Sequence, residues 1–136
     1  MSVPSSQRAE NKLQALKDTF AMTTYTIQMC ENEKVFPKKC RWNLCSRIID
    51  QCLYAVIHIR QANRINAVDD ESFSRRAELQ NQVLLDFEAL WGLMTIAFEA
   101  YSVPANKVET WSDLMLTAEE RVMAWRTADI KRFKKK

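Results

Sequence analysis

Glycine is nearly absent from this chain, and this limits the fold more than any other feature of the sequence. It occurs once, as Gly92, among 136 residues, whereas average usage would give about nine or ten. β-hairpins and phosphate-binding loops depend on glycine because it adopts positive φ angles without steric cost. The composition therefore argues against an all-β fold, a Rossmann domain and a P-loop, and it favours helices with short polar connections.

The remaining composition fits one small globular domain. A length of 136 residues lies within the range of about 100–200 that single domains occupy. Hydrophobic residues make up 47% of the chain and charged residues 27%, which is the balance of a soluble globular protein. We therefore expect a single four-helix-bundle domain over residues 1–136, with a disordered lead-in at 1–6 and a basic tail at 131–136.

Hydrophobic periodicity predicts four helices of about 25 residues each. Pro37 suits the first turn of a helix, and polar segments follow the second and third helices. The predicted helices cover about residues 7–32, 73–102 and 107–132, with a second helix that starts between residues 37 and 40 and ends at about residue 66. Because short turns make successive helices antiparallel, the sequence predicts an all-α, antiparallel up-down four-helix bundle.

Each predicted helix has its own apolar pattern. The first and second carry stripes typical of amphipathic helices, and the fourth has the most regular heptad spacing. The third is too apolar for one stripe, so it either sits centrally or also faces a partner subunit. The stripe residues are Leu13, Leu16, Phe20, Thr23, Ile27 and Cys30; then Cys45, Ile49, Cys52, Val56 and Ile59, broadened by Ile48, Leu53 and Ala55; then Val108, Trp111, Met115, Ala118, Val122 and Trp125.

Residues suited to catalysis or metal binding are few. The four cysteines include no CxxC pair, and His58 is the single histidine. The sequence also lacks a signal peptide and a long uncharged apolar run. We therefore expect free, buried thiols in a reducing cytoplasm, no membrane association, no metal or other cofactor, and no enzymatic activity. An enzyme or metal protein built on Cys45, Cys52 and His58 is the alternative.

Charge is segregated along the chain. Residues 1–68 contain ten Lys or Arg and five Asp or Glu, residues 69–130 contain five and twelve, and the tail adds five cations in six residues. Clustered cations favour nucleic acid because binding releases counterions, although an ordinary solvated helix face is the alternative. The candidate residues for binding nucleic acid or a partner are Lys34, Lys38, Lys39, Arg41, Arg47, Arg60 and Arg64, with Lys131 and Arg132 of the tail.

One tryptophan differs from the others in its sequence surroundings. Trp91, Trp111 and Trp125 lie in apolar helical patterns and are expected in the core, whereas Trp42 follows three cations and a cysteine. Trp42 either packs under a neighbouring subunit, which we favour, or stacks on a base.

Several segments together resemble a known family. They are Val35-Phe36-Pro37-Lys38 at the start of the second helix, Ile59-Arg60-Gln61-Ala62-Asn63 near its end, and a final helix with Trp111 and Trp125. In this combination the chain resembles the accessory variability determinant (Avd) proteins of diversity-generating retroelements. These belong to a wider family of four-helix bundles that includes the ribosomal-RNA intervening-sequence protein. The similarity covers about residues 7–132.

The resemblance implies both an assembly and a role. Avd proteins form homopentamers with a positively charged surface, and they bind the reverse transcriptase of the element. With the template RNA, or an RNA–DNA hybrid, they support mutagenic cDNA synthesis. The match places Lys38, Arg60 and Asn63 on the family's motifs. An intervening-sequence-type interaction module without a reverse transcriptase partner is the alternative, although the segment Asn63-Arg64-Ile65-Asn66-Ala67 lacks the glycine usual in that branch.

Overall fold

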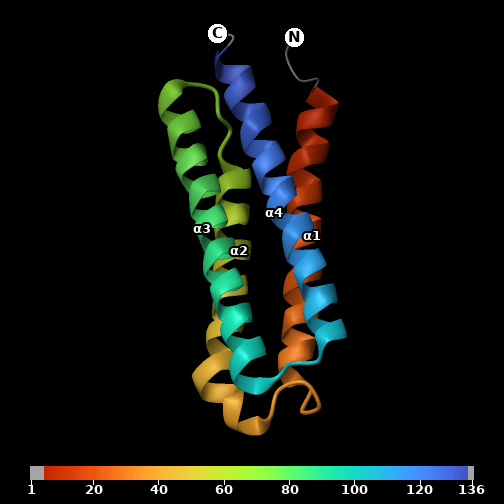
Figure 1. Cartoon of the computed structure of the whole chain (residues 1–136). Helices are drawn as coiled ribbons and strands as arrows, with labels where there is room; N and C mark the ends of the chain where they lie inside the picture. The colour runs from red at the N-terminus through yellow and green to blue at the C-terminus, as the bar shows by residue number, and fades with distance from the viewer. Residues whose placement is uncertain (1–4, 135–136) are drawn as a thin grey trace.

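The structure is a computed structural model that describes the backbone of residues 5–134 and the side chains of residues 12–134. Four α-helices make up most of it: α1 (Ser5–Glu31), α2 (Ser46–Arg64), α3 (Asp70–Tyr101) and α4 (Ala105–Lys134). No strand occurs in this part of the chain. The prediction of an all-helical chain with four helices is confirmed, and the arrangement is that of a four-helix bundle (Figure 1).

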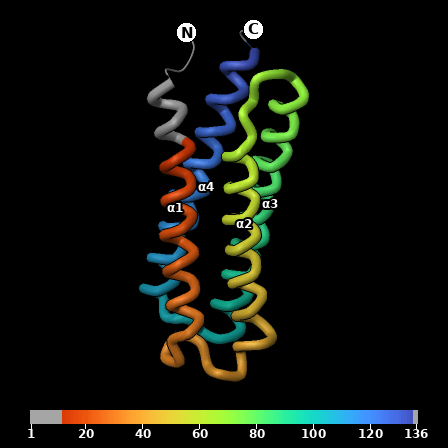
Figure 2. Tube along the Cα trace, turned by 180° about the vertical axis from the view of Figure 1, so that it is seen from behind, coloured from red at the N-terminus to blue at the C-terminus, as the bar shows by residue number. Residues whose placement is uncertain are grey.

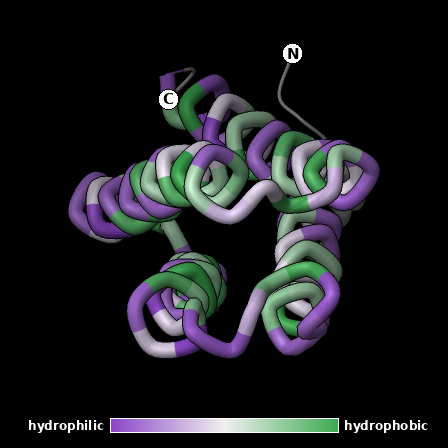
Figure 3. The backbone as a smooth tube through the Cα atoms, turned by 60° about the horizontal axis from the view of Figure 1, so that its bottom comes forward, coloured by the Kyte–Doolittle hydropathy of each residue, from purple (hydrophilic) through white to green (hydrophobic). Residues whose placement is uncertain are grey.

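The helices pair unevenly around the bundle. α2 packs most extensively against α3, and α1 against α4, while the α1–α2 and α3–α4 contacts are smaller. Figures 1 and 2 show the start of α1, the end of α4 and the α2–α3 connection at one end, which we call the terminal end. The connections at residues 32–45 and 102–104 lie at the opposite, far end. Hydrophilic segments lie mainly on the outer sides of the helices (Figure 3).

The predicted helix boundaries hold to within a few residues except at the start of α2. A 3₁₀ turn, Lys38–Cys40, and a π-helical turn, Arg41–Cys45, precede the regular helix. At the other boundaries, α1 begins at Ser5, inside the predicted lead-in, and α4 continues into the basic tail as far as Lys134. Residues 1–4 and 135–136 of those two segments lie outside the described residues.

The apolar pattern predicts the core well in α4. Trp111, Met115, Ala118 and Val122 are fully buried, and Trp125 is nearly so. Tryptophan and methionine at steps of three and four fill the space between α4 and its neighbours, as a heptad pattern requires. The predicted heptad of this helix is therefore confirmed.

The pattern predicts the core poorly in α1. The side chains of Leu13 and Phe20 are 51% and 39% exposed, whereas Thr19 and Thr26 are fully buried. Each threonine hydroxyl donates to the carbonyl oxygen four residues earlier, at 2.8 Å and 2.7 Å, so its burial leaves no polar group unpaired. The buried residues of α1 thus differ from the predicted stripe except at Thr23; among the described side chains they are Ala15, Thr19, Met22, Thr23, Thr26 and Met29. In α2, the 41% exposed Leu53 likewise lies outside the core.

A buried ion pair joins α3 to α4 near the terminal end. The Nε and Nη2 atoms of Arg76 each donate to a different carboxylate oxygen of Asp129 at 2.8 Å. Arg76 Nη1 also donates to the carbonyl oxygen of Ile65, and the Gln80 amide donates to Asp129. Arg76 and Asp129 are each 2% exposed. A buried charge is tolerated only when paired and hydrogen-bonded in this way.

The two ends of α3 differ in how they are capped. At its start, Asp69 and Ser72 form a reciprocal capping box, and the hydrogen bond from the Ser72 backbone N–H lowers the pKa of the Asp69 carboxyl. At its end, Ser102 adopts a left-handed conformation with φ of 50°, which glycine occupies at lower cost. The far end therefore carries a local backbone strain.

Candidate nucleic-acid interface

The structure divides most of the predicted basic residues between the two ends of the bundle. Lys34, Lys38, Lys39 and Arg41 lie on the α1–α2 connection at the far end, whereas Arg60 lies near the opposite end of α2. At 1.5 Å per helical residue, Arg41 and Arg60 are separated by roughly 28 Å along the helix. Apart from Arg47, the candidate cations of the first half therefore form two groups, and not one continuous face.

The cations at the far end are exposed, and few carboxylates of the chain pair with them. Its four residues are all exposed, and Lys38 alone forms an ion pair among the described residues, with Glu33 at 3.5 Å. Both partners of that pair are more than half exposed, so it contributes little stability and competes weakly with another anion. Lys34, Lys38, Lys39 and Arg41 lie within eight residues of the chain, and we call them the far-end cations.

The terminal-end group is partly engaged in holding the fold. The guanidinium of Arg132 lies 3.8 Å from Asp129 and 4.9 Å from the centroid of the Phe133 ring. Phe133 in turn packs on Phe73 at the start of α3. These contacts of Arg132 and Phe133 therefore stabilise the last turns of α4 and their packing against the start of α3.

The other cations of the terminal end are accessible. Arg60, Arg64 and Lys131 are exposed. Arg64 also lines an open cavity of about 470 Å³ with Arg75, Asn66 and Ser72.

Arg47 belongs to neither group. It is exposed on α2 and borders a groove between α2 and α3, whose other side includes Gly92 and Ile96. A Cβ atom added at Gly92 would meet nothing within 4 Å, and the Ile96 side chain is 53% exposed. This groove has an apolar floor next to a cation.

Trp42 projects from the far end and is 84% exposed. Trp111 and Trp125 lie in the core as the sequence predicts, and Trp91 is half-buried against it, whereas Trp42, which the sequence sets apart, lies outside the core. The π-helical turn accounts for the difference, because the Ser46 backbone N–H bonds back to the Arg41 carbonyl, five residues earlier. The wider turn keeps Leu44 and Cys45 in the core while Trp42 lies outside it. π-helical turns are rare and occur frequently at functional sites.

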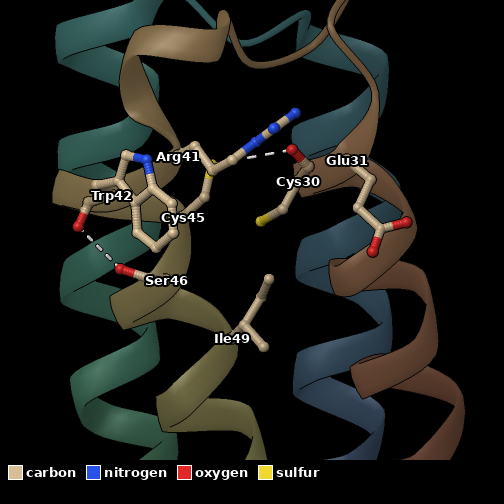
Figure 4. Close-up of a pocket in the computed structure, with 7 residues that line it drawn as sticks. All are labelled: Cys30, Glu31, Arg41, Trp42, Cys45, Ser46 and Ile49. Atoms are coloured by element: carbon tan, nitrogen blue, oxygen red, sulfur yellow. Dashed lines mark hydrogen bonds between the residues drawn. The ribbon is translucent and has the colours of Figure 1, made fainter.

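A cavity of about 490 Å³ opens beside Trp42, between the end of α1 and the start of α2. In Figure 4, the indole ring and the Glu31 side chain lie on opposite sides of the opening, with the Cys30 thiol and Ile49 between them. Arg41, Cys45 and Ser46 complete the lining. Ser46 donates its hydroxyl to the Trp42 carbonyl at 2.9 Å, which ties the π-helical turn to α2.

The thiols that line this cavity are free and uncharged at neutral pH. The Cys45 thiol approaches the carbonyl oxygen of Cys30 at 3.9 Å. Burial raises the pKa of both thiols above the ordinary value, because a thiolate loses its hydration in an apolar site. The two residues behave as small apolar groups, as the sequence predicts.

His58 has a partner that the sequence does not reveal. Its Nδ1 atom lies 2.6 Å from a carboxylate oxygen of Asp86 on α3, and the Gln51 amide donates to the other oxygen at 3.1 Å. Asp86 is 3% exposed, so these contacts hold α2 to α3 through a buried carboxylate.

His58 and the cysteines lie on different sides of α2. Cys45 and Cys52 contact α1 through Cys30 and Met22, whereas His58 contacts α3. The structure does not bring the three residues together into the site considered as an alternative from the sequence. Among the described residues there is also no group of three His, Cys, Asp or Glu suited to a metal ion.

The buried polar residues are the largest omission of the sequence analysis. Gln80 lies three residues before the buried Val83 of α3, Arg76 lies four residues before Gln80, and Asp129 continues the α4 stripe one turn after Trp125. Polar residues at core positions of a heptad are the signal that identifies such a network.

None of the described helices has an apolar stretch long enough to cross a membrane.

Comparisons of the chain with protein-family models, with curated proteins and with solved structures find no match. The fold and the side chains of the far end therefore carry the functional argument.

Proposed function

We propose that this chain is a non-catalytic accessory subunit of a diversity-generating retroelement. In this role it binds the reverse transcriptase and the template RNA, or an RNA–DNA hybrid, and supports mutagenic cDNA synthesis. The observation that carries the proposal is the group of far-end cations, which are exposed, close in sequence, and opposed by a single weak ion pair among the described residues. Such a surface attracts a phosphate backbone.

Exposed apolar side chains support assembly with other subunits. On α1, Leu13 and Phe20 are exposed and seven residues apart, and on α4, Leu116 and Met123 repeat that spacing at 46% and 51% exposure. A seven-residue repeat is the spacing of helix–helix seams. We propose that antiparallel, up-down bundles associate through these outer seams, as a homopentamer in keeping with the family resemblance.

Co-expression with the reverse transcriptase encoded beside the gene tests the proposal. We expect the two proteins to co-purify, and we expect light scattering of the chain alone to give about five times its mass of 15.9 kDa. A pentamer that binds no polymerase would instead favour the intervening-sequence-type module. A monomer that binds neither polymerase nor RNA would contradict the proposal.

A further inference from the structure

We propose that the cavity beside Trp42 binds an unpaired nucleobase, with the indole stacked on the base and the far-end cations holding the neighbouring phosphates. This inference rests on the proposed function. It adds which part of the nucleic acid is bound, and at which site of the bundle.

The shape of the cavity suits a flat ring. Its volume of about 490 Å³ lies within the range of about 300–1,000 Å³ that small-molecule sites occupy. Trp42 supplies an aromatic face that its own chain leaves uncovered, since the residue is 84% exposed. Every base offers a π-face, so an indole at this place binds bases with little regard to sequence.

The walls of the cavity suit an apolar ring with polar edges. Cys30, Cys45 and Ile49 form an uncharged surface in its interior (Figure 4). Glu31 lies at the rim, where its carboxylate can accept hydrogen bonds from the exocyclic amino group of a base. A base that enters from a single strand therefore meets both an apolar wall and a hydrogen-bond acceptor.

The charges around the opening favour a polyanion over an apolar peptide. Arg41 lines the cavity, and Lys38 and Lys39 precede it on the adjoining 3₁₀ turn. Neither Lys39 nor Arg41 forms an ion pair within the described part of the chain. A strand whose base occupies the cavity would carry its flanking phosphates past these cations, and a duplex would not, because its bases are stacked and paired.

The test compares two fluorescently labelled strands of equal length and equal charge. One is a twelve-nucleotide single strand, and the other carries abasic sites at its six central positions. We expect the intact chain to bind the base-containing strand roughly 5- to 150-fold more tightly in fluorescence anisotropy, which is the effect of stacking one base. We also expect this strand alone to quench the emission of Trp42.

Three variants locate the effect. Trp42→Ala should bind both strands with the affinity of the abasic strand, whereas Trp42→Phe should keep most of the preference. Ile49→Trp fills the interior of the cavity while Trp42 itself is kept, and it should also abolish the preference. Leu85→Ala, which removes a 55% exposed side chain from α3, is the matched control and should bind as the unaltered chain does. Thermal melting confirms that each variant is folded.

The outcomes separate this inference from the proposed function. Equal binding of the two strands, or an undiminished preference in Trp42→Ala or Ile49→Trp, would overturn the base site and leave phosphate binding in place. An absence of binding to either strand would overturn both.

Discussion

The two ends of the bundle use arginine in opposite ways. At the terminal end, Arg76 is buried and donates to two oxygens of Asp129. At the far end, Arg41 is exposed and forms no ion pair among the described residues. It begins the π-helical turn that carries the exposed Trp42, and the strained Ser102 lies at the same end of the bundle. The buried pair of the terminal end satisfies its own charges and stabilises the fold, whereas the far end retains exposed, largely unpaired charge and backbone strain. Such costs are tolerated where a surface has a function to perform.

The largest expected effect is at the terminal end. Asp129→Ala should lower the free energy of unfolding by about 3–5 kcal/mol, because Arg76 would remain buried without its partner. Urea denaturation measures the loss. Asp113→Ala removes an exposed carboxylate from the same helix and should change stability by less than about 0.5 kcal/mol.

A double replacement sharpens this prediction. Changing Arg76 to Met and Asp129 to Leu together should restore most of the stability lost in Asp129→Ala, since an apolar pair needs no counter-charge. If Asp129→Ala were as stable as the unaltered chain, the terminal end would not differ from the far end in the way we describe.

The sequence predicts the fold more fully than it predicts this contrast. The scarcity of glycine, the apolar periodicity of four segments and the short connections between them predict a four-helix bundle, because they reflect helix propensity and the spacing of core residues. The core line of α1 escapes prediction because threonine can bond to its own helix, which allows Thr19 and Thr26 inside while Leu13 and Phe20 remain outside.

The candidate site is predictable in composition but not in geometry. The far-end cations are recognisable from charge counting. However, the position of Trp42 depends on a π-helical turn that keeps Leu44 and Cys45 buried, and charge counting does not report such a turn. The pairing of Arg76 with Asp129 joins residues 53 positions apart, and a single sequence does not report such distant partners.

An intermediate effect on stability is expected from the ionisation of the buried Cys52 thiol at high pH. Burial raises the pKa of Cys52 to about 12, from an ordinary 9.0. The thiol therefore stabilises the fold fully below pH 9, and this stability is lost as the pH rises towards 12, because the unfolded thiol ionises first. At pH 10 the loss should be about 1.4 kcal/mol for this group.

Urea denaturation at pH 8 and pH 10 measures this loss. In Cys52→Ala the decline between the two pH values should be smaller by that amount, which removes the contribution of other titrating groups. An equal decline in both proteins would mean that the thiol ionises freely in the fold, contrary to its burial.

The smallest expected effects concern two residues near the far end whose backbone lowers the stability of the fold, Ser102 and Gly92. Ser102→Gly should raise stability by about 0.5–1 kcal/mol, because the position is left-handed. Gly92→Ala should do so by a similar amount, since its Cβ would meet open space in the middle of a helix. Thermal unfolding measures both. If either variant were less stable than the unaltered chain, the backbone at that position would not be destabilising in the way we describe.

The salt dependence of single-strand binding tests the central claim most directly, namely that the far end holds the phosphate backbone. We expect log K to fall linearly with log salt concentration, with a slope of about −0.7 for each phosphate neutralised. The triple variant Lys38→Ala, Lys39→Ala, Arg41→Ala should reduce the magnitude of that slope by about 2. The matched triple variant at the terminal end, Arg60→Ala, Arg64→Ala, Lys131→Ala, should change it by less than half as much. A slope that is unaffected by the far-end variant, or reduced mainly by the terminal-end variant, would contradict the account.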